Sequence, residues 1–174
     1  MALRNLLGSD DERLRKASRV VEKFDGRLHT LLDDMRETLG KADGAGIAAP
    51  QIGVLRRVVV IDLEDETPLE MVNPVITEKS GTQREIEGCL SLPDLWGYVV
   101  RPNYVKIEAQ DRFGNKFVKE GTDELATAFC HEIDHLNGVL FADLADEIVD
   151  DPQASESYRK RKRKRRQRKA KQEM

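Results

Sequence analysis

The segment TDELATAFCHEIDHLNG, residues 122–138, contains two of the three histidines in the chain. Its apolar side chains gather on one side of a helix that begins near Thr122 and stops at the Asn-Gly pair closing the segment. His131 and His135 are four residues apart, so both imidazoles lie on one face of this helix, one turn apart. The H-E-x-x-H pattern that they form around Glu132 is typical of a helix that binds a divalent metal ion.

The sequence around this helix predicts sheets on which it packs. Asp25 is a candidate N-cap for a first helix ending near Gly40, and residues 41–53 are expected to be a loop because three glycines and a proline remove all periodicity. Strand-like runs follow at 56–63, at 69–78 with an interruption at Asn73-Pro74, at 97–100, at 104–111 and at 116–120, with a hairpin turn at 112–115. This order predicts an α+β fold with mostly antiparallel sheets packed around the central metal-binding helix.

Length and composition narrow the class of protein. The 174 residues predict one domain, residues 1–150, followed by an extension over residues 151–174 that is either helical or disordered. With 35% charged residues and no apolar run near the roughly 18 residues of a membrane span, we expect a cytoplasmic protein that does not bind membranes. The N-terminus lacks the apolar core of a signal peptide. Two cysteines do not make a disulfide framework, so both thiols are expected to be free.

The net charge of −3 conceals a strong asymmetry. Residues 159–171, RKRKRKRRQRKAK, hold eleven of the 29 Lys and Arg residues, which leaves 18 basic and 32 acidic residues elsewhere and a net charge of −14 there. An acidic body with a basic tail indicates that the two parts meet different partners. Such a block is either a solvated end or a phosphate-binding surface, and it has too few apolar residues to lie on a membrane.

A catalytic metal site of the zinc type takes three ligands from the protein, so a third must join the two histidines. The remaining histidine, His29, lies in the middle of the first helix and is expected at the surface. Cys130 precedes His131 and lies about 100° away from it around the helix, so its thiol does not easily reach the same ion. It is expected in the core. Cys89, presented by a turn after a strand candidate, is favoured as the third ligand. Glu156, 21 residues beyond the second histidine, is its competitor, because some zinc peptidases use a glutamate at that distance.

Three separated stretches resemble the signature motifs of bacterial peptide deformylases, in their order and in their spacing. They are GAGIAAPQ (44–51), EGCLS (87–91) and HEIDH (131–135), and the resemblance covers roughly residues 10–145. Enzymes of this family remove the formyl group from the N-terminal formylmethionine of newly made proteins and release formate. The resemblance therefore implies a metal-dependent amide hydrolase that acts on N-formylmethionyl nascent peptides.

The resemblance also implies which residues carry the chemistry. Glu132 is the general base, while the Gln51 side-chain amide and the Leu90 backbone N–H donate to the oxygen that becomes negatively charged. The cofactor is one divalent ion, expected to be Fe²⁺, with Zn²⁺, Ni²⁺ or Co²⁺ as substitutes. The expected ligands of this ion are Cys89, His131 and His135.

Further residues of the matched motifs are expected to bind the peptide, and Glu87 is also expected to anchor its loop. They are Gly44, Ala45, Gly46, Glu87 and Gly88. The sequence departs from the family pattern at Ala45, where many relatives carry a larger aliphatic residue, so the shape of the methionine pocket is expected to differ. It departs again at Cys130, where a glutamine is common.

The resemblance also bears on the basic tail. A deformylase meets polypeptides as they leave the ribosome, and some relatives dock there through a basic C-terminal helix. We therefore expect residues 159–171 to bind ribosomal RNA.

Two other functions stay open on the residues alone. The first is a zincin-type metallopeptidase in which Glu156 is the third ligand and Cys89 belongs to the core. The second is an RNA-binding protein with a structural metal site, in which Glu132 has no catalytic function.

Overall fold

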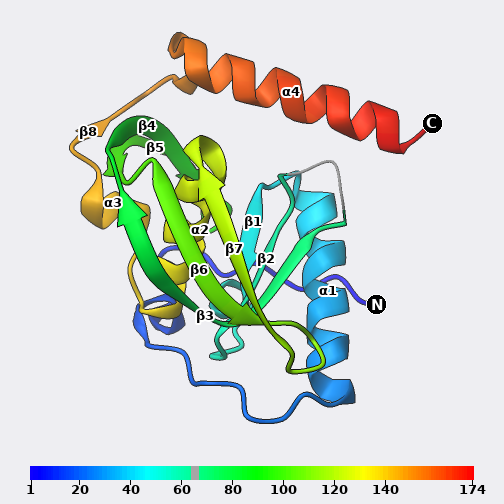
Figure 1. Ribbon diagram of the computed structural model, residues 1–174. Helices are drawn as coiled ribbons and strands as arrows, with labels where there is room; N and C mark the ends of the chain where they lie inside the picture. Colours follow the sequence, from blue (N-terminus) through cyan, green and yellow to red (C-terminus); the bar gives the residue numbers. More distant parts are fainter. Residues whose placement is uncertain (64–66) are drawn as a thin grey trace.

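The computed structural model describes residues 1–63 and 67–174 (Figure 1). Within these ranges a five-stranded sheet has the order β1-β2-β3-β6-β7, a three-stranded sheet has the order β4-β5-β8, and neighbouring strands are antiparallel. The strands are β1 Gly46–Ala48, β2 Val58–Ile61, β3 Leu69–Ser80, β4 Gln83–Cys89, β5 Leu92–Arg101, β6 Tyr104–Gln110, β7 Lys116–Thr122 and β8 Glu147–Ile148. The helices are α1 Gly26–Ala42, α2 Asp123–Leu136, α3 Phe141–Leu144 and α4 Glu156–Gln172, with 3-10 turns η1 Glu12–Arg15, η2 Ala49–Ile52 and η3 Pro152–Ala154.

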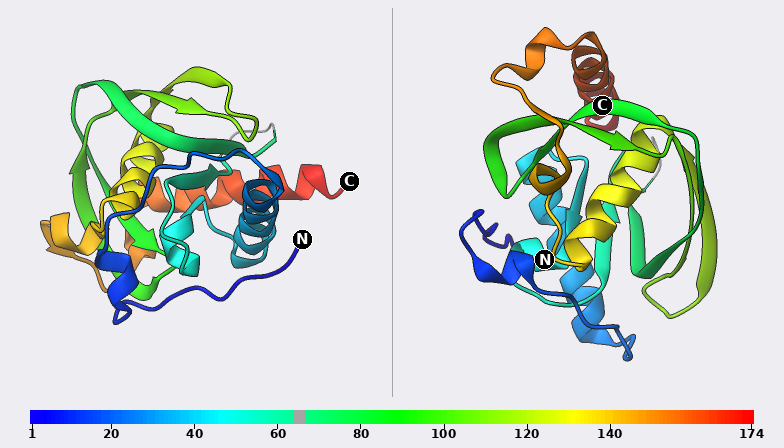
Figure 2. Two further views of the ribbon diagram at one scale, coloured as in Figure 1. Left: turned by 90° about the horizontal axis from the view of Figure 1, so that it is seen from below. Right: turned by 90° about the vertical axis from the view of Figure 1, so that its left-hand side faces the viewer.

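Helix α2 is the central element, and the strands curve around it (Figures 1 and 2). Its apolar side packs on the larger sheet, where Phe129 and Leu136 are fully buried against residues such as Val105 and Ile107. The helix begins after Thr122 and ends before Asn137, as its sequence predicts. The expected α+β fold, with antiparallel sheets around this helix, is confirmed.

Strand β2 separates two parts of the core. Val59 and Ile61 belong to the cluster that contains α2, whereas Val58 and Val60 belong to the cluster that contains α1. Because side chains alternate across a strand, only a continuous apolar run can satisfy both faces. The run VVVI therefore forms a strand that is buried along its whole length.

The first helix has close to its expected bounds. Asp25 is its N-cap and accepts hydrogen bonds from the N–H groups of Arg27 and Leu28. The expected end near Gly40 is confirmed to within two residues, because α1 continues to Ala42 and closes at Asp43, which takes the left-handed conformation (φ 55°). A single exposed glycine costs a helix only about 1 kcal/mol, which the buried apolar face of α1 outweighs.

Residues 41–53 are more regular than the expected loop. They contain β1, which pairs with β2 through Gly46 and Ile61, and the 3-10 turn η2, which carries Pro50 and Gln51. The strand has three residues and a glycine at its start, so local sequence gives no periodic signal. Strand β1 forms because it pairs with β2, which is buried along its whole length.

The interruption expected at Asn73-Pro74 is a bulge rather than a break. Strand β3 runs on through it, with a shift of its register against β6 between Val72 and Val75. Asn73 has φ 52°, and its side-chain amide bonds to both backbone groups of Val21. An Asn is well suited to this position because it tolerates the left-handed region better than most residues.

The basic tail is helical, which confirms one of its two expected states. Helix α4 runs across one end of the molecule, from above β4 and β5 toward α1 (Figure 1). No helix in the described part of the chain is long and apolar enough to cross a membrane.

Two glycine substitutions should have opposite effects on stability. At Gly138, which ends α2 with φ 74°, an added Cβ would lie 2.4 Å from the carbonyl oxygen of Arg15, so Gly138→Ala should destabilise the protein by roughly 2 kcal/mol or more. At Gly40 an added Cβ meets nothing within 4 Å, and Gly40→Ala should stabilise the protein by about 0.5–1 kcal/mol. Urea unfolding of both variants measures these changes, and a neutral Gly138→Ala would contradict the packing described here.

Candidate active site

Three metal-binding side chains meet beside α2. Cys89 is the last residue of β4, and His131 and His135 project from α2. Their ligand atoms all lie within 4.8 Å of one another, and Cys89 Sγ is 3.3 Å from His135 Nε2. A sulfur and a nitrogen bound to one tetrahedral ion are separated by about 3.5 Å. The group therefore fits a single metal ion, with the thiolate and imidazole donors that borderline and soft divalent ions prefer.

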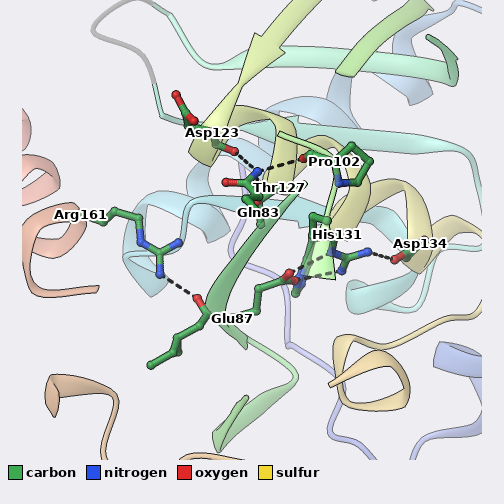
Figure 3. Close-up of polar contacts among 10 residues, drawn as sticks. Gln83, Glu87, Pro102, Asp123, Thr127, His131, Asp134 and Arg161 are labelled. Atoms are coloured by element: carbon green, nitrogen blue, oxygen red, sulfur yellow. Dashed lines mark hydrogen bonds and ion pairs between the residues drawn. The ribbon is translucent and has the colours of Figure 1, made fainter. Parts of the chain in front are cut away.

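Side-chain bonds fix β4 against the start of α2 (Figure 3). The amide nitrogen of Gln83 donates to the carbonyl oxygens of Pro102 and Asp123 and to Thr127 Oγ1. At its other end β4 reaches Cys89 through an irregularity in its pairing with β5. Gln83 therefore holds the start of β4 against α2, and the Cys89 thiol lies at the other end of this strand.

Glu87 orients the first histidine (Figure 3). His131 Nδ1 lies 2.8 Å from Glu87 Oε1, and a proton on Nδ1 leaves the lone pair of Nε2 free for a metal. Arg101 donates to both oxygens of Glu87, at 2.9 and 3.0 Å, and to Asp134 at 2.6 Å. Burial raises the pKa of Glu87, but the hydrogen bonds from His131 and Arg101 outweigh it and bring that pKa to about 2. The carboxylate is therefore ionised at neutral pH.

The carboxylate of Glu132 is buried beside the donors. The residue is 4% exposed, and its Oε2 has no hydrogen-bond partner among the described residues. Burial raises the pKa of this carboxyl to about 7, and a cation bound nearby would lower it. An unpaired buried carboxylate oxygen is costly, so this atom is available for a ligand or a water molecule.

Gln51 presents its amide nitrogen to the same place. Its Oε1 accepts from the N–H of Ala48 at 2.9 Å, which turns Nε2 toward Cys89 Sγ at 3.4 Å and Ser91 Oγ at 3.3 Å. The side chain is 1% exposed and therefore fixed. Leu90 follows in the turn between β4 and β5. The structure thus places the Gln51 amide beside Cys89, and Leu90 is the next residue after Cys89 in the chain.

The glycines near the site leave room for specific neighbours. A Cβ on Gly46 would lie 2.7 Å from Glu132 Oε1, and a Cβ on Gly88 would lie 2.3 Å from the ring of Trp96. A Cβ on Gly44 would touch the Leu90 side chain at 2.9 Å. An added Cβ at these positions would displace side chains that pack on them, which local sequence cannot reveal.

A cleft of about 430 Å³ contains the site. Its walls include Gly44, Ala45, Gly46, Gln51, Cys89, His131 and Glu132, and also side chains of Trp96 and of α4. Glu87 and Gly88 line it too, but the carboxylate oxygens of Glu87 bond to Arg101 and His131. A larger hollow of about 730 Å³ beside α1 contains none of the three metal donors.

Other residues considered from the sequence lie elsewhere. His29 lies apart from the three metal donors and is half-buried, at the edge of the exposed side of α1, with Nε2 2.8 Å from the carbonyl oxygen of Arg112. Cys130 lies in the core as expected, and burial raises the pKa of its thiol. Glu156 is in the first turn of α4, exposed and paired with Lys160, so it does not join the two histidines.

Two features of the site have no signal in the sequence. Arg101 ends β5 and has an ordinary strand environment in the sequence, yet it is 6% exposed and holds Glu87. The α4 side chains that line the cleft were expected only as part of a basic tail. Both depend on contacts between residues far apart in the chain.

Known proteins with the same fold and sequence pattern are peptide deformylases. Residues 3–150 match the family described as polypeptide deformylase. A peptide deformylase of Caldicellulosiruptor bescii is 57% identical over 143 residues, which cover 82% of this chain and 86% of that protein. One from Alkaliphilus metalliredigens is 54% identical, with coverage of 82% and 97%.

Solved structures agree with these relatives. The crystal structure of a peptide deformylase from Legionella pneumophila has a TM-score of 0.81 and 42% sequence identity, and the match covers 98% of each chain. A peptide deformylase from Ehrlichia chaffeensis in complex with actinonin has a TM-score of 0.81 and 34% identity, covering 84% of this chain and 90% of that one.

Replacing Glu87 should weaken metal binding. Glu87→Gln removes the charged acceptor of His131 Nδ1, and loss of such a partner typically lowers metal affinity about 10–100-fold. Competition with a chelator measures this affinity. Glu85→Gln, two residues away on the same strand, is the control, because its carboxylate accepts from Ser157 instead. An unchanged affinity in Glu87→Gln would contradict the orienting role.

Proposed function

The chain belongs to the peptide deformylase family, and we propose that its reaction takes place where Cys89, His131 and His135 hold one metal ion. It is a metal-dependent hydrolase that removes the N-terminal formyl group from N-formylmethionyl nascent peptides and releases formate. One observation supports this location above the others: three donor atoms lie within 4.8 Å of one another, beside the unpaired oxygen of a buried glutamate.

The proposed ion is Fe²⁺, and Zn²⁺, Ni²⁺ or Co²⁺ are expected to replace it. A thiolate with two imidazoles suits all four ions, and none of the ligands is a hard oxygen donor that would favour Mg²⁺ or Ca²⁺. The bound ion supplies a Lewis acid for the formyl oxygen and lowers the pKa of a water molecule.

The proposed catalytic residues surround this ion. Glu132 accepts the proton of the attacking water and passes it to the amine nitrogen that leaves. The amide N–H of Gln51 and the backbone N–H of Leu90 donate to the formyl oxygen while it gains negative charge, and one such donor is worth about 3 kcal/mol. Glu87 and Arg101 act indirectly, because they hold His131 in its orientation.

The peptide is proposed to lie between two strand edges. Strand β1 is an edge of the larger sheet and β4 is an edge of the smaller one, and residues of both line the cleft. An extended peptide adds to such edges through backbone hydrogen bonds. Gly44, Gly46 and Gly88 would let it approach closely, and Ala45 would contribute to the wall of the methionine pocket.

The catalytic step has a direct test. With iron-loaded protein kept free of oxygen, wild type should release formate from formyl-Met-Ala-Ser. Glu132→Gln should keep its metal but lose activity by about 10²–10⁴-fold, because only the proton acceptor is removed. Cys89→Ala should contain little metal, whereas Glu156→Ala should match wild type. Full activity in Glu132→Gln, or normal metal content in Cys89→Ala, would contradict the proposal.

We further propose that the region from 151 to 174 is an extension that binds ribosomal RNA and keeps the enzyme near its cytoplasmic substrates. Its support is the run of eleven Lys and Arg residues in one helix, many of them exposed. Binding of this kind weakens steeply as salt rises.

Co-sedimentation with ribosomes tests the extension. A chain that ends at Ser157 lacks the basic run and should not pellet with ribosomes at low salt, whereas the full chain should pellet and be released as salt is raised. Formate release from a short peptide shows that the shortened protein is folded. Undiminished pelleting of the shortened chain would contradict the proposal.

A further inference from the structure

Helix α4 is attached to the smaller sheet on one side of the cleft. Ser157 Oγ donates to Glu85 at 2.5 Å, and the Tyr158 ring packs edge-to-face on Trp96 with 5.3 Å between centroids. Arg161 donates to the carbonyl oxygen of Ile86 at 2.7 Å, on the edge strand β4 (Figure 3). The N-terminal half of the helix therefore lies along the strand that ends at the candidate metal site.

The other half of α4 is attached across the cleft. Arg168 is 7% exposed and donates to both the carbonyl oxygen and the carboxylate of Asp62, at 2.8 Å each. Lys169 Nζ lies 2.5 Å from the carboxylate of Asp43, which closes α1 just before Gly44. Because Asp62 follows β2 and Ile86 belongs to β4, the helix spans the opening from one sheet to the other (Figures 1 and 2).

The middle of α4 forms a wall of the cleft. Four basic side chains line the same cavity as Cys89 and Glu132: Arg161, Lys162, Arg165 and Arg166. Within the described part of the chain, no carboxylate forms an ion pair with any of these four. Of the four acidic residues that line the cavity, Glu87 pairs with Arg101 and Asp43 pairs with Lys169, whereas Glu124 and Glu132 have no ion-pair partner among the described residues. The four positive charges of this wall are therefore not held in ion pairs, although Arg165 and Arg166 interact with Asp43 over a longer distance.

We propose that Lys162 and Arg165 give the enzyme a preference for peptides with acidic side chains directly after the formylmethionine. The proposal rests on the proposed function, because it requires that the peptide leave the metal site through this cleft. Both residues are only partly exposed, and charges interact more strongly where water is partly excluded. An Asp or Glu beside them is attracted, while a Lys in the same place is repelled.

Two peptides test the preference: formyl-Met-Asp-Glu and formyl-Met-Lys-Lys, with formyl-Met-Ala-Ser as the reference. For iron-loaded full-length protein at low salt, kcat/KM should be about tenfold higher for the acidic peptide than for the basic one, and the ratio should fall as salt is raised. In K162Q/R165Q the ratio should fall close to one. R163Q/K164Q is the matched control, because it removes two charges from exposed positions of the same helix that do not line the cavity.

Each outcome decides the proposal. A ratio near one in wild type, or a ratio that K162Q/R165Q leaves unchanged, overturns it. An equal loss in R163Q/K164Q overturns it as well, because the effect would then come from the overall charge of the tail and not from the wall. If wild type releases formate from none of the three peptides, the proposed function fails and this inference fails with it.

Discussion

The buried ion pair between Arg101 and Glu87 joins three elements that the site requires. Arg101 ends β5, Glu87 lies in β4, and their partners His131 and Asp134 lie on α2. Cys89 is two residues beyond Glu87 on the same strand, so the contacts that orient the histidine also fix the distance of the thiol from the helix. A buried ion pair contributes little net stability, because desolvation offsets attraction. Here the ion pair positions β4, β5 and α2 relative to one another. It can do so only within the packed sheets around it.

The larger sheet is held in place by apolar side chains on both of its faces. Strand β2 packs on α1 with one face and on α2 with the other, and β1 pairs with its edge. This arrangement places Gly46 directly against the carboxylate of Glu132, where any larger residue would collide. The same layering brings Gln51 from η2 under Cys89. The reactive side chains thus come from three segments, β4, η2 and α2, and the apolar core between them keeps the groups in place.

Whether a feature could be predicted from the sequence depends on how far apart in the chain the residues that form it lie. The bounds of α2 and the pairing of its histidines are local, and they were predictable from spacing and from the Asn-Gly stop. The choice of Cys89 over Glu156 needed the unfilled ligand position and the family likeness. Three features depend on residues far along the chain, so no local pattern indicates them. They are the strand β1, the hydrogen bond of His29 to Arg112, and the ion pair of Arg101 with Glu87. The course of α4 was unpredictable for the same reason, because apart from the Tyr158 ring its contacts are polar and distributed along a strongly basic helix.

The central claim is that one ion is bound by a thiolate of β4 together with two histidines of α2. Electronic absorption of the cobalt-loaded protein tests it most directly, since a thiolate bound to Co²⁺ gives a sulfur-to-metal charge-transfer band. We predict this band in wild type and in Cys130→Ser, and its loss in Cys89→Ser. A band that persists in Cys89→Ser, or that disappears in Cys130→Ser, would contradict the account.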